Sequence, residues 1–336
     1  MTAQKNIVLD VRHLRTEFGP IERPLVAVDD VSFQVREGEI LGLVGESGSG
    51  KSITLRSILG IVRPRGRVSG EIFWRGRDLA TLDEAQLRRV RGKEIAMIFQ
   101  EPMSSLNPLL TVGLQIQENL VAHTDLDARA RKTRAIELLD MVGIPAARNR
   151  LDDYPHEFSG GMRQRVMIAI ALASNPQLLL ADEPTTALDV TIQDQILRLI
   201  QSLSRDLGMA VILVTHDMGV VAETCDRVAV MYGGRLCETG STVDVIGSAR
   251  HPYTLGLLRS IPRDVPPRTP LYSIPGAPPA LNALPPGCAF TARCPVAAPS
   301  CRDVRPPLAA VGDRRHVACH QLEEASVFFA QREAAQ

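Results

Sequence analysis

Short runs of apolar residues at three places along the chain predict buried β-strands. Ile40–Val44, Leu178–Ala181 and Ala210–Thr215 are uninterrupted apolar segments, and helical patterns lie between them. This alternation is typical of a parallel α/β sheet with crossover helices. Nearer the start, Ile7–Val11 and Val26–Val35 alternate β-branched with polar residues and predict two further strands.

Helical patterns dominate the middle of the chain. The segment from about Glu101 to Ile170 includes Asp127–Val142, in which apolar residues recur among charged ones. We interpret residues 101–170 as an inserted helical lobe of a core that spans residues 1–250. Most of the 23 prolines and four of the six cysteines then follow, so residues 251–336 are expected to form a separate, loop-rich extension.

Composition limits the classes of function. Lys and Arg together number 38, as do Asp and Glu, so no net field attracts nucleic acid or anionic lipid, and any nucleotide site must be local. No apolar stretch reaches the roughly 18 residues that a membrane-spanning helix needs. The first residues also lack the apolar region of a signal peptide. We therefore expect a cytoplasmic protein that would reach a membrane only by docking on integral partners.

A phosphate-binding loop is expected directly after the first buried strand. It consists of Gly45, Glu46, Ser47, Gly48, Ser49, Gly50, Lys51 and Ser52. This order fits G-x-x-x-x-G-K-[ST], with a strand before it and a predicted helix beginning near its lysine. The glycines let backbone N–H groups surround phosphate oxygens. Lys51 is expected to bridge the β- and γ-phosphates, and Ser52 to bind Mg²⁺.

Polar residues that follow the other strands predict the hydrolytic groups. Asp182 and Glu183 end one buried strand, and ligands of open α/β sheets collect at such ends. Asp182 suits the Mg²⁺ shell, while Glu183 can polarise the attacking water. His216 ends the next strand and can hydrogen-bond the γ-phosphate. Gln100 follows another apolar segment and could reach Mg²⁺ or the attacking water.

A second anion-binding surface is expected at a helix start further along the chain. Ser159 is a good helix cap, and Gly160 and Gly161 leave the backbone of the following turn exposed. One chain thus carries two surfaces suited to phosphate.

These motifs, in this order, resemble those of the ABC ATPases over about residues 5–250. The resemblance identifies a Walker A motif at Gly45–Ser52, a Q-loop at Gln100, a signature at Phe158–Met162, a Walker B motif at Leu178–Asp182 with Glu183, a D-loop at Ala187–Asp189 and a switch at His216. It implies an α/β, ABC-type P-loop ATPase core with an antiparallel β subdomain and an inserted helical subdomain. It also implies a head-to-tail dimer in which the signature, with Asp189 nearby, closes over ATP bound to the other subunit. Phe18 resembles the aromatic that stacks on adenine, with Phe33 as an alternative. Met162 stands where the common signature has Gln.

The start of the extension, from His251 to Thr254, is similar to the C-terminal extension of oligopeptide/dipeptide importer ATPases. The resemblance implies a peripheral subunit on the cytoplasmic face of the inner membrane. Its implied partners are two membrane permeases, a second ATPase in a heterodimer and, through the permeases, an external solute-binding protein. Dipeptides or oligopeptides are the expected solutes, with glutathione or nickel complexes as alternatives. A soluble ABC ATPase acting on DNA or ribosomes is the rival function, although such proteins usually carry two cassettes or coiled-coil inserts.

The extension also carries a predicted metal site formed by Cys288, Cys294, Cys301 and Cys319. Stable disulfides are not expected in a cytoplasmic protein, and thiolates bind zinc or iron–sulfur clusters. The spacing resembles that of importer ATPases whose tails bind a [4Fe-4S] cluster, which we favour over Zn²⁺ and over unligated thiols. Such a site would fold a proline-rich tail that has little core of its own.

Overall fold

The computed structural model describes residues 6–101, 105–261 and 272–333. Its contacts divide the chain into two compact units. Unit 1 comprises residues 1–8, 35–40 and 81–214, and unit 2 comprises residues 9–34, 41–80 and 215–336. Each unit is described by itself below.

Unit 1 is built on the parallel strands β6 (Ile95–Ile98), β7 (Leu178–Asp182) and β8 (Ala210–Thr215). Every residue of β7 and β8 is buried, as expected for central strands covered on both faces. The register pairs Ile98 with Ala181 and Asp182 with Val214, so neighbouring strands end at the same sheet edge. Two of the strands predicted from apolar runs are therefore confirmed almost to the residue.

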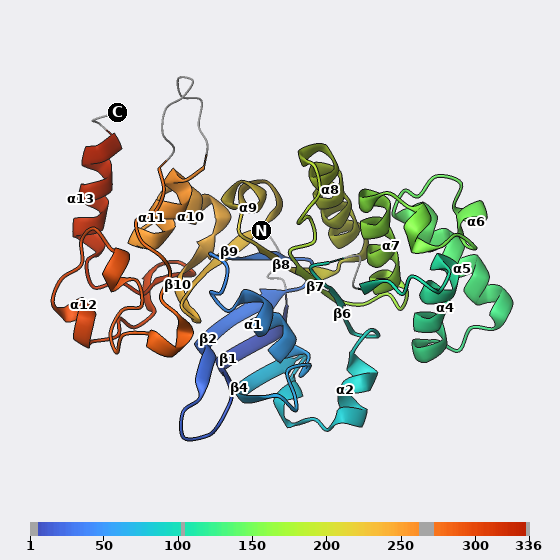
Figure 1. The fold of residues 1–336 in the computed structure, drawn as a ribbon, viewed down its shortest axis with the longest axis horizontal. Coiled ribbons are helices and arrows are strands. Elements are labelled where there is room, and N and C mark those ends of the chain that lie inside the picture. The colour runs from blue at the N-terminus through green and yellow to red at the C-terminus, as the bar shows by residue number, and fades with distance from the viewer. Residues whose placement is uncertain (1–5, 102–104, 262–271, 334–336) are drawn as a thin grey trace. The chain divides into compact units, whose positions relative to one another are not determined.

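Helices make up most of the rest of unit 1 (Figure 1). They are α2 (Glu84–Val90), α4 (Val112–His123), α5 (Ala128–Met141), α6 (Ala147–Arg150), α7 (Gly160–Leu172) and α8 (Val190–Leu207), with a 3₁₀ turn η2 (Pro155–Glu157). Asp127 caps α5 by accepting a hydrogen bond from the Ala130 N–H at 2.7 Å. Three of these helices, α4, α5 and α7, contact one another, and α7 also packs on β6. The predicted helical character of this part of the chain is confirmed.

Unit 2 carries the parallel pair β3 (Ile40–Val44) and β9 (Arg227–Tyr232). Strand β9 pairs antiparallel with β10 (Arg235–Ser241). Two strands from the extension continue this ladder, because β12 (Arg315–Val317) pairs with β10 and β11 (Ala309–Gly312) pairs with β12. The extension is thus joined to the cassette through backbone hydrogen bonds rather than by packing alone.

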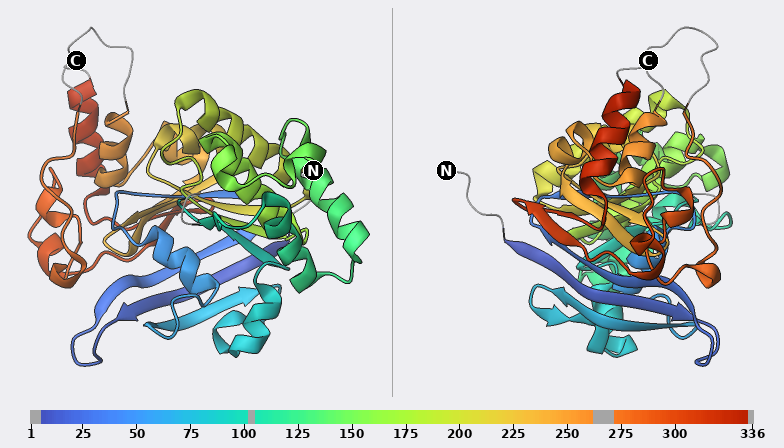
Figure 2. Two further views of the ribbon diagram at one scale, coloured as in Figure 1. Left: turned by 45° about the vertical axis from the view of Figure 1, so that its right-hand side comes forward. Right: turned by 90° about the vertical axis from the view of Figure 1, so that its left-hand side faces the viewer.

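A second, antiparallel sheet in unit 2 has the strand order β2-β1-β4-β5. Its strands are β1 (Ile7–Phe18), β2 (Leu25–Arg36), β4 (Gly66–Trp74) and β5 (Arg77–Asp78), followed by a 3₁₀ turn η1 (Leu79–Thr81). Both views of Figure 2 show β1, β2 and β4 side by side. Strand β1 runs seven residues past the predicted end at Val11, because pairing with β4 resumes after a bulge between Arg12 and Arg15. The α/β cassette fold with an antiparallel subdomain is confirmed.

The helices of unit 2 lie in both the cassette and the extension. They are α1 (Lys51–Ile58), α9 (Met218–Thr224), α10 (Thr242–Gly247), α11 (Pro252–Arg259), α12 (Ser300–Asp303) and α13 (Leu322–Glu333), with 3₁₀ turns η3 (Leu281–Ala283) and η4 (Thr291–Arg293). Helix α1 begins at the predicted lysine. Helix α13 lies beside α11 (Figure 2), where the Arg259 guanidinium sits 5.5 Å from the centre of the Phe329 ring.

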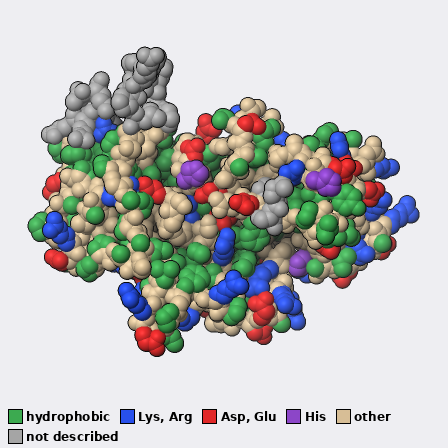
Figure 3. Space-filling view, in the orientation of Figure 1, with side chains coloured by type: hydrophobic (Ala, Val, Ile, Leu, Met, Phe, Trp, Pro, Cys, Tyr) green, Lys and Arg blue, Asp and Glu red, His purple; other side chains and the backbone are tan. Residues whose placement is uncertain are grey.

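The described helices include none that is both long and apolar enough to cross a bilayer. On the face shown in Figure 3, Lys and Arg side chains are interspersed with Asp and Glu. This mixture agrees with the zero net charge of the chain and gives that face no large field of one sign.

Candidate nucleotide site and its contacts with the extension

The loop between β3 and α1 has a backbone that only glycine can supply at two positions. Gly45 has φ of 154° and Gly50 has φ of 103°. A Cβ on Gly45 would stand 2.2 Å from the Met231 carbonyl oxygen, and one on Gly50 would stand 2.7 Å from that of Ala27. The loop is therefore wrapped closely against β9 and β2, which fixes its concave shape.

The polar groups of this loop suit the binding of an anion. The Lys51 side chain is buried, and its Nζ donates to the carbonyl oxygens of Gly45 at 2.6 Å and Glu46 at 3.0 Å. The Ser49 Oγ is buried and has no hydrogen-bond partner among the described residues. Ser52 lies in the first turn of α1, where backbone N–H groups face the loop. A buried cation, an unsatisfied hydroxyl and a helix start together fit a phosphate group.

Two further loop positions, Ser47 and Gly48, are exposed to solvent. A Cβ on Gly48 would meet no atom within 4 Å. This part of the loop is therefore open to solvent.

The carboxyl ends of β6 and β7 bring together two predicted hydrolytic residues in unit 1. The Gln100 Nε2 donates to the Glu183 Oε2 at 3.2 Å, and the Thr186 Oγ1 donates to the same oxygen at 2.8 Å. Glu183 has φ of 47°, a left-handed conformation that is uncommon for a side chain of this type. Its backbone N–H donates to the Val214 carbonyl at 3.1 Å. Asp182, the last residue of β7, is fully buried.

Strain at Glu183 has a structural cause that the sequence did not reveal. The chain must leave β7 abruptly while Glu183 stays hydrogen-bonded to β8, and the left-handed turn achieves both. Such strain is typical of functional positions that the surrounding structure holds in place. Thr186 was not among the predicted site residues, and only its three-residue spacing from Glu183 hinted at the contact.

Two other predicted site residues, His216 and Phe18, belong to unit 2. His216 follows the last residue of β8 and is exposed. Phe18 ends β1, and its half-buried ring packs so closely over Gly66 that a Cβ there would be 2.8 Å away. Phe33, the alternative aromatic, is only 7% exposed inside the antiparallel sheet. Of these two aromatics, Phe18 is the more accessible.

The predicted second phosphate surface lies at the start of α7 in unit 1. Ser159 caps this helix, with its Oγ accepting from the Met162 N–H at 3.3 Å. Ser159 and Gly160 are exposed, whereas a Cβ on Gly161 would stand 2.6 Å from the Ile192 side chain. Asp189 caps the adjacent α8 by accepting from the Ile192 N–H at 2.9 Å. Gly161 is thus required for the approach of α7 to α8.

Contacts between the extension and the phosphate loop were not predicted. The Glu46 N–H donates to the Tyr253 Oη at 2.8 Å. The Glu46 carboxylate accepts two hydrogen bonds from Arg293, at 2.6 Å and 3.0 Å. Tyr253 lies within the family motif from His251 to Thr254, and the sequence around Arg293 carries no signal beyond its place next to Cys294.

The predicted cysteine ligands lie in one region of the extension. The Cys288 N–H donates to the Cys301 carbonyl at 2.8 Å, which joins two of them through the backbone. Burial raises the pKa of Cys294 to about 12, and the charges of Cys319, Cys288 and Cys301 add to the rise. Burial likewise raises the pKa of Cys319 to about 11, although its sulfur accepts from the Gln321 N–H at 3.3 Å. The four thiols are thus close enough to sense one another's charge.

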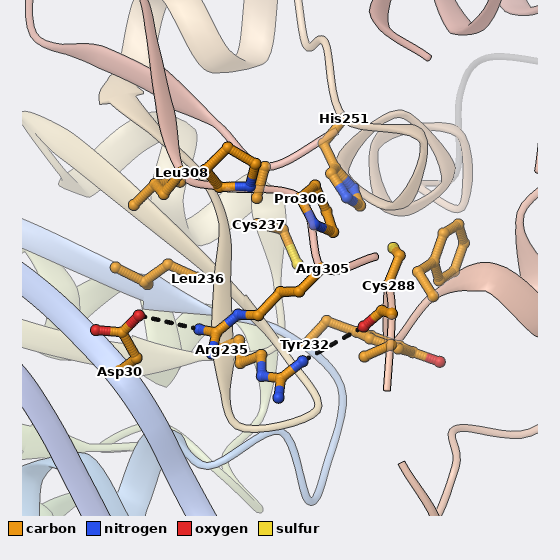
Figure 4. A pocket seen from close by; sticks show the side chains of 15 residues that line it. Asp30, Tyr232, Arg235, Leu236, Cys237, His251, Cys288, Arg305, Pro306 and Leu308 are labelled. Carbon is orange, nitrogen blue, oxygen red and sulfur yellow. Dashed lines mark hydrogen bonds and ion pairs between the residues drawn. The ribbon is translucent and has the colours of Figure 1, made fainter. Parts of the chain in front are cut away.

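The two remaining cysteines, Cys225 and Cys237, are packed thiols. Cys225 and Cys237 are 9% and 7% exposed, and burial raises the pKa of both. Cys237 lines a cavity of about 300 Å³ together with Cys288, Arg235 and Arg305. Figure 4 shows Arg305 reaching Asp30 across this cavity.

The metal site expected from the four cysteines is not shown by the structure. Within residues 6–101, 105–261 and 272–333, no group of three or more His, Cys, Asp or Glu side chains is arranged to hold a metal ion.

Comparison with known proteins settles the family. Residues 28–186 match the ABC transporter family, and residues 237–301 match the C-terminal region of oligopeptide/dipeptide transporters. The dipeptide transport ATP-binding protein DppD of Haemophilus influenzae is 49% identical over 93% of this chain and 95% of its own length. The chain belongs to the ATP-binding subunits of the oligopeptide/dipeptide ABC transporter family. The oligopeptide transport ATP-binding protein OppD of Salmonella typhimurium is 48% identical, with 95% of each chain covered.

Solved structures support the same family and its chemistry. An ATP-binding cassette described as a dimeric post-hydrolysis state bound to ADP and Pi is 30% identical, with a TM-score of 0.63. The match covers 70% of this ABC subunit and 98% of that chain. The part left uncovered is consistent with an extension that a bare cassette lacks. The family has ATP as its nucleotide and ATP hydrolysis as its reaction, so the ATPase activity expected from the motifs is confirmed at this level.

Proposed function

We propose that this ABC ATPase subunit energises the import of dipeptides or oligopeptides across the inner membrane. The observation that carries the proposal is similarity along the whole chain: DppD and OppD are 49% and 48% identical and are matched over at least 93% of this chain. The match includes the extension, which a generic cassette lacks. The two named relatives transport dipeptides and oligopeptides, which supports peptides over glutathione or nickel complexes.

We propose the following division of labour at the nucleotide. The loop Gly45–Ser52 holds the phosphates, with Lys51 exchanging its carbonyl partners for phosphate oxygens. Ser52, Asp182 and Gln100 supply oxygen ligands that suit Mg²⁺, which would neutralise charge on the phosphates. Glu183 orients and polarises the attacking water, and His216 donates a hydrogen bond to the γ-phosphate. Phe18 stacks on adenine.

Glu183 is held by contacts that suit this role. Gln100 and Thr186 both donate to its Oε2, so the orientation of the carboxylate is fixed from two sides. A carboxylate fixed in this way loses little freedom when it binds water. Gln100 lies at the start of the predicted helical lobe and could report the presence of the γ-phosphate to it.

Two such ATPase subunits would close around ATP in the working transporter. Ser159, Gly160 and Gly161, with Asp189 close by, would face the ATP held by the phosphate loop of a second ATPase subunit. We propose a heterodimer, with residues 1–250 as the ATPase domain, residues 101–170 as its helical subdomain and residues 251–336 as the extension.

Membrane permeases are implied by the family, and we propose two of them together with an external solute-binding protein. The segment after Gln100 offers a surface for this contact. Leu109 is 82% exposed in the described part of this segment, and Gln115 holds the turn by accepting from the Asn107 N–H at 2.9 Å. The subunit would then lie peripherally on the cytoplasmic face of the membrane.

We also propose that Cys288, Cys294, Cys301 and Cys319 hold a [4Fe-4S] cluster, with Zn²⁺ as the alternative. Supporting observations are the mutual proximity of the four thiols and the N–H donated to the Cys319 sulfur. A bound cluster would supply four metal–thiolate bonds to a tail with few buried side chains, so its role would be structural.

Metal analysis of anaerobically purified protein tests the cysteine site. We expect iron and acid-labile sulfide, with both lost in Cys294→Ser and kept in the control Cys225→Ser, which removes a packed thiol. Zinc in place of iron would support the alternative. The absence of iron, sulfide and zinc would reject the site while leaving the ATPase function intact.

Affinity purification of the tagged chain from gently solubilised membranes tests the transport function. We expect two permeases and a second ATPase to co-purify, and deletion of the gene to abolish uptake of labelled dipeptide or oligopeptide. Recovery of only ribosomal or DNA-associated proteins, with normal peptide uptake, would reject the proposal.

A further inference from the structure

Two side chains of the extension, Tyr253 and Arg293, form hydrogen bonds with Glu46 of the phosphate loop. The Tyr253 hydroxyl accepts the Glu46 N–H at 2.8 Å. Arg293 donates from Nη1 to the Glu46 Oε2 at 2.6 Å and from Nη2 to the Oε1 at 3.0 Å. Backbone and side chain of the same loop residue are therefore both fixed from outside the loop, by residues more than 200 positions away along the chain.

Arg293 is itself held rigidly. Its side chain is only 4% exposed, and its Nε donates to the Pro275 carbonyl at 3.0 Å. Its Nη1 lies 3.3 Å from the Tyr232 hydroxyl, and the rings of Tyr232 and Phe290 lie within 6 Å of its guanidinium carbon. A planar guanidinium with so many contacts has one orientation available, so it transmits its position to the carboxylate that it binds.

Tyr253 is equally well fixed. It is fully buried in α11, with its ring centre 4.6 Å from that of Tyr232 and 5.4 Å from that of Phe290. Burial raises the pKa of its hydroxyl, so the group stays neutral. A neutral oxygen at this place can accept the Glu46 N–H without adding charge near the phosphates.

Glu46 connects these contacts to the lysine of the loop. Its carbonyl oxygen accepts from the Lys51 Nζ at 3.0 Å. A shift of the Glu46 backbone would therefore move an oxygen that now holds the Lys51 ammonium. The pair with Arg293 is partly shielded from water, because the Arg293 and Glu46 side chains are 4% and 27% exposed.

We propose that Arg293 and Tyr253 are positioning residues that hold Glu46 and thereby keep the phosphate loop in its binding shape. The extension then sets the affinity of the chain for ATP. This inference rests on the proposed function, in which residues 45–52 bind the phosphates of ATP. It adds a nucleotide-tuning role to a segment that is otherwise expected to act only as a folded appendage.

Two variants separate positioning from simple charge effects. Tyr253→Phe removes only the hydroxyl, so the net charge does not change. The double variant Glu46→Gln/Arg293→Met removes the ion pair, and its net charge equals that of the original chain. If the residues acted only through the electrostatic potential at the phosphates, Tyr253→Phe would leave ATP binding unchanged, and the paired loss of a negative charge in the loop and a positive charge beyond it would not weaken binding. If they position the loop, both variants weaken it.

The measurement is the dissociation constant for Mg·ATP by isothermal titration calorimetry on the purified full-length chain. Loss of one neutral hydrogen bond is expected to raise the constant about fivefold in Tyr253→Phe. The double variant is expected to raise it about tenfold, within the range of coupling between linked sites. In steady-state assays KM for ATP should rise with kcat nearly unchanged, the pattern of lost uniform binding.

The matched control is Asp30→Asn/Arg305→Met, which removes the ion pairs that Arg305 of the extension makes with Asp30 and Asp29 of the cassette, with no net change in charge. Circular dichroism must show all proteins folded at the temperature used. An unchanged dissociation constant in either test variant overturns the inference, as does an equal rise in the control. If the original chain itself fails to bind ATP, the proposed function fails instead.

Discussion

The buried ion pair between Glu238 and Arg315 gives the sharpest prediction about stability. Glu238 lies in β10 with its side chain fully buried, and the Arg315 Nη2 in β12 lies 2.9 Å from its Oε1. The carboxylate also accepts from the backbone N–H groups of Arg250 at 3.0 Å and His251 at 2.9 Å. Substitution of Arg315 by Met would keep most of the apolar stem and leave a buried charge without its counter-ion.

The magnitude follows from these contacts. Removing one partner of a buried ion pair costs roughly 3–5 kcal/mol, because the remaining charge is neither solvated nor neutralised. The two backbone N–H groups keep part of the stabilisation, so we expect about 3 kcal/mol for Arg315→Met. At about 2–4 °C per kcal/mol for a unit of this size, the melting temperature should fall by roughly 6–12 °C.

Trp74, the single tryptophan, offers a local probe, since it is 1% exposed within unit 2. Thermal unfolding followed by its fluorescence should show the full shift in Arg315→Met and a smaller one in Glu238→Gln/Arg315→Met, in which no charge remains buried. The control is Arg12→Met, whose guanidinium is 52% exposed and pairs with Asp10. We expect the control to lose less than about 1 kcal/mol. Equal shifts in Arg315→Met and Arg12→Met would refute the reasoning.

Three further predictions concern the nucleotide site and pH. Glu183→Gln should retain ATP binding but lower the rate of steady-state ATP hydrolysis by at least about 100-fold, because a general base is lost. An unchanged rate of phosphate release would show that Glu183 is not the general base. Gly50→Ala should lower the ATP affinity and destabilise the chain by roughly 1–3 kcal/mol, since its φ is 103° and the new Cβ meets the Ala27 carbonyl oxygen. Gly76→Ala, with φ of 81° and open space around the site, is its control and should leave the ATP affinity unchanged. Burial lowers the pKa of His251 from 6.5 to about 4. Between these two pH values the unfolded chain binds more protons than the folded chain. The free energy of unfolding should therefore rise by about 3 kcal/mol as the pH increases from 4 to 6.5. His251→Asn, which keeps a side-chain acceptor for the Tyr253 N–H, should flatten that rise in urea unfolding curves; an unaltered slope would contradict the assignment.

Local sequence patterns predicted the strands and the nucleotide motifs because the relevant physics is local. Continuous apolar runs mark β7 and β8, whose residues are all buried. The glycines of the phosphate loop are required by backbone angles that no other residue adopts easily, as the φ of Gly50 shows. Capping residues such as Asp127 and Ser159 act within three positions along the chain.

Long-range pairings could not be read in the same way. Nothing in the local pattern indicated that β12 would pair with β10, because a three-residue strand has too few positions to show a period. The ion pair of Arg293 with Glu46 joins residues that are 247 positions apart. The sequence around Arg293 does not indicate which carboxylate it binds. The cysteine spacing likewise indicated proximity of the thiols but not how they are arranged in space.

A continuous series of hydrogen bonds connects the buried ion pair with the phosphate loop. Glu238 accepts the N–H of His251, the His251 Nδ1 accepts the N–H of Tyr253 at 3.0 Å, and the Tyr253 hydroxyl accepts the N–H of Glu46. Such a series is not by itself evidence of energetic coupling, which requires a measured non-additivity. Arg315→Met combined with Tyr253→Phe provides that measurement. If the pair acts on ATP affinity through Tyr253, Arg315→Met will weaken binding in the original chain but not further in Tyr253→Phe. If it serves only to attach β12, the dissociation constant will be the same with and without Arg315, although the melting temperature falls.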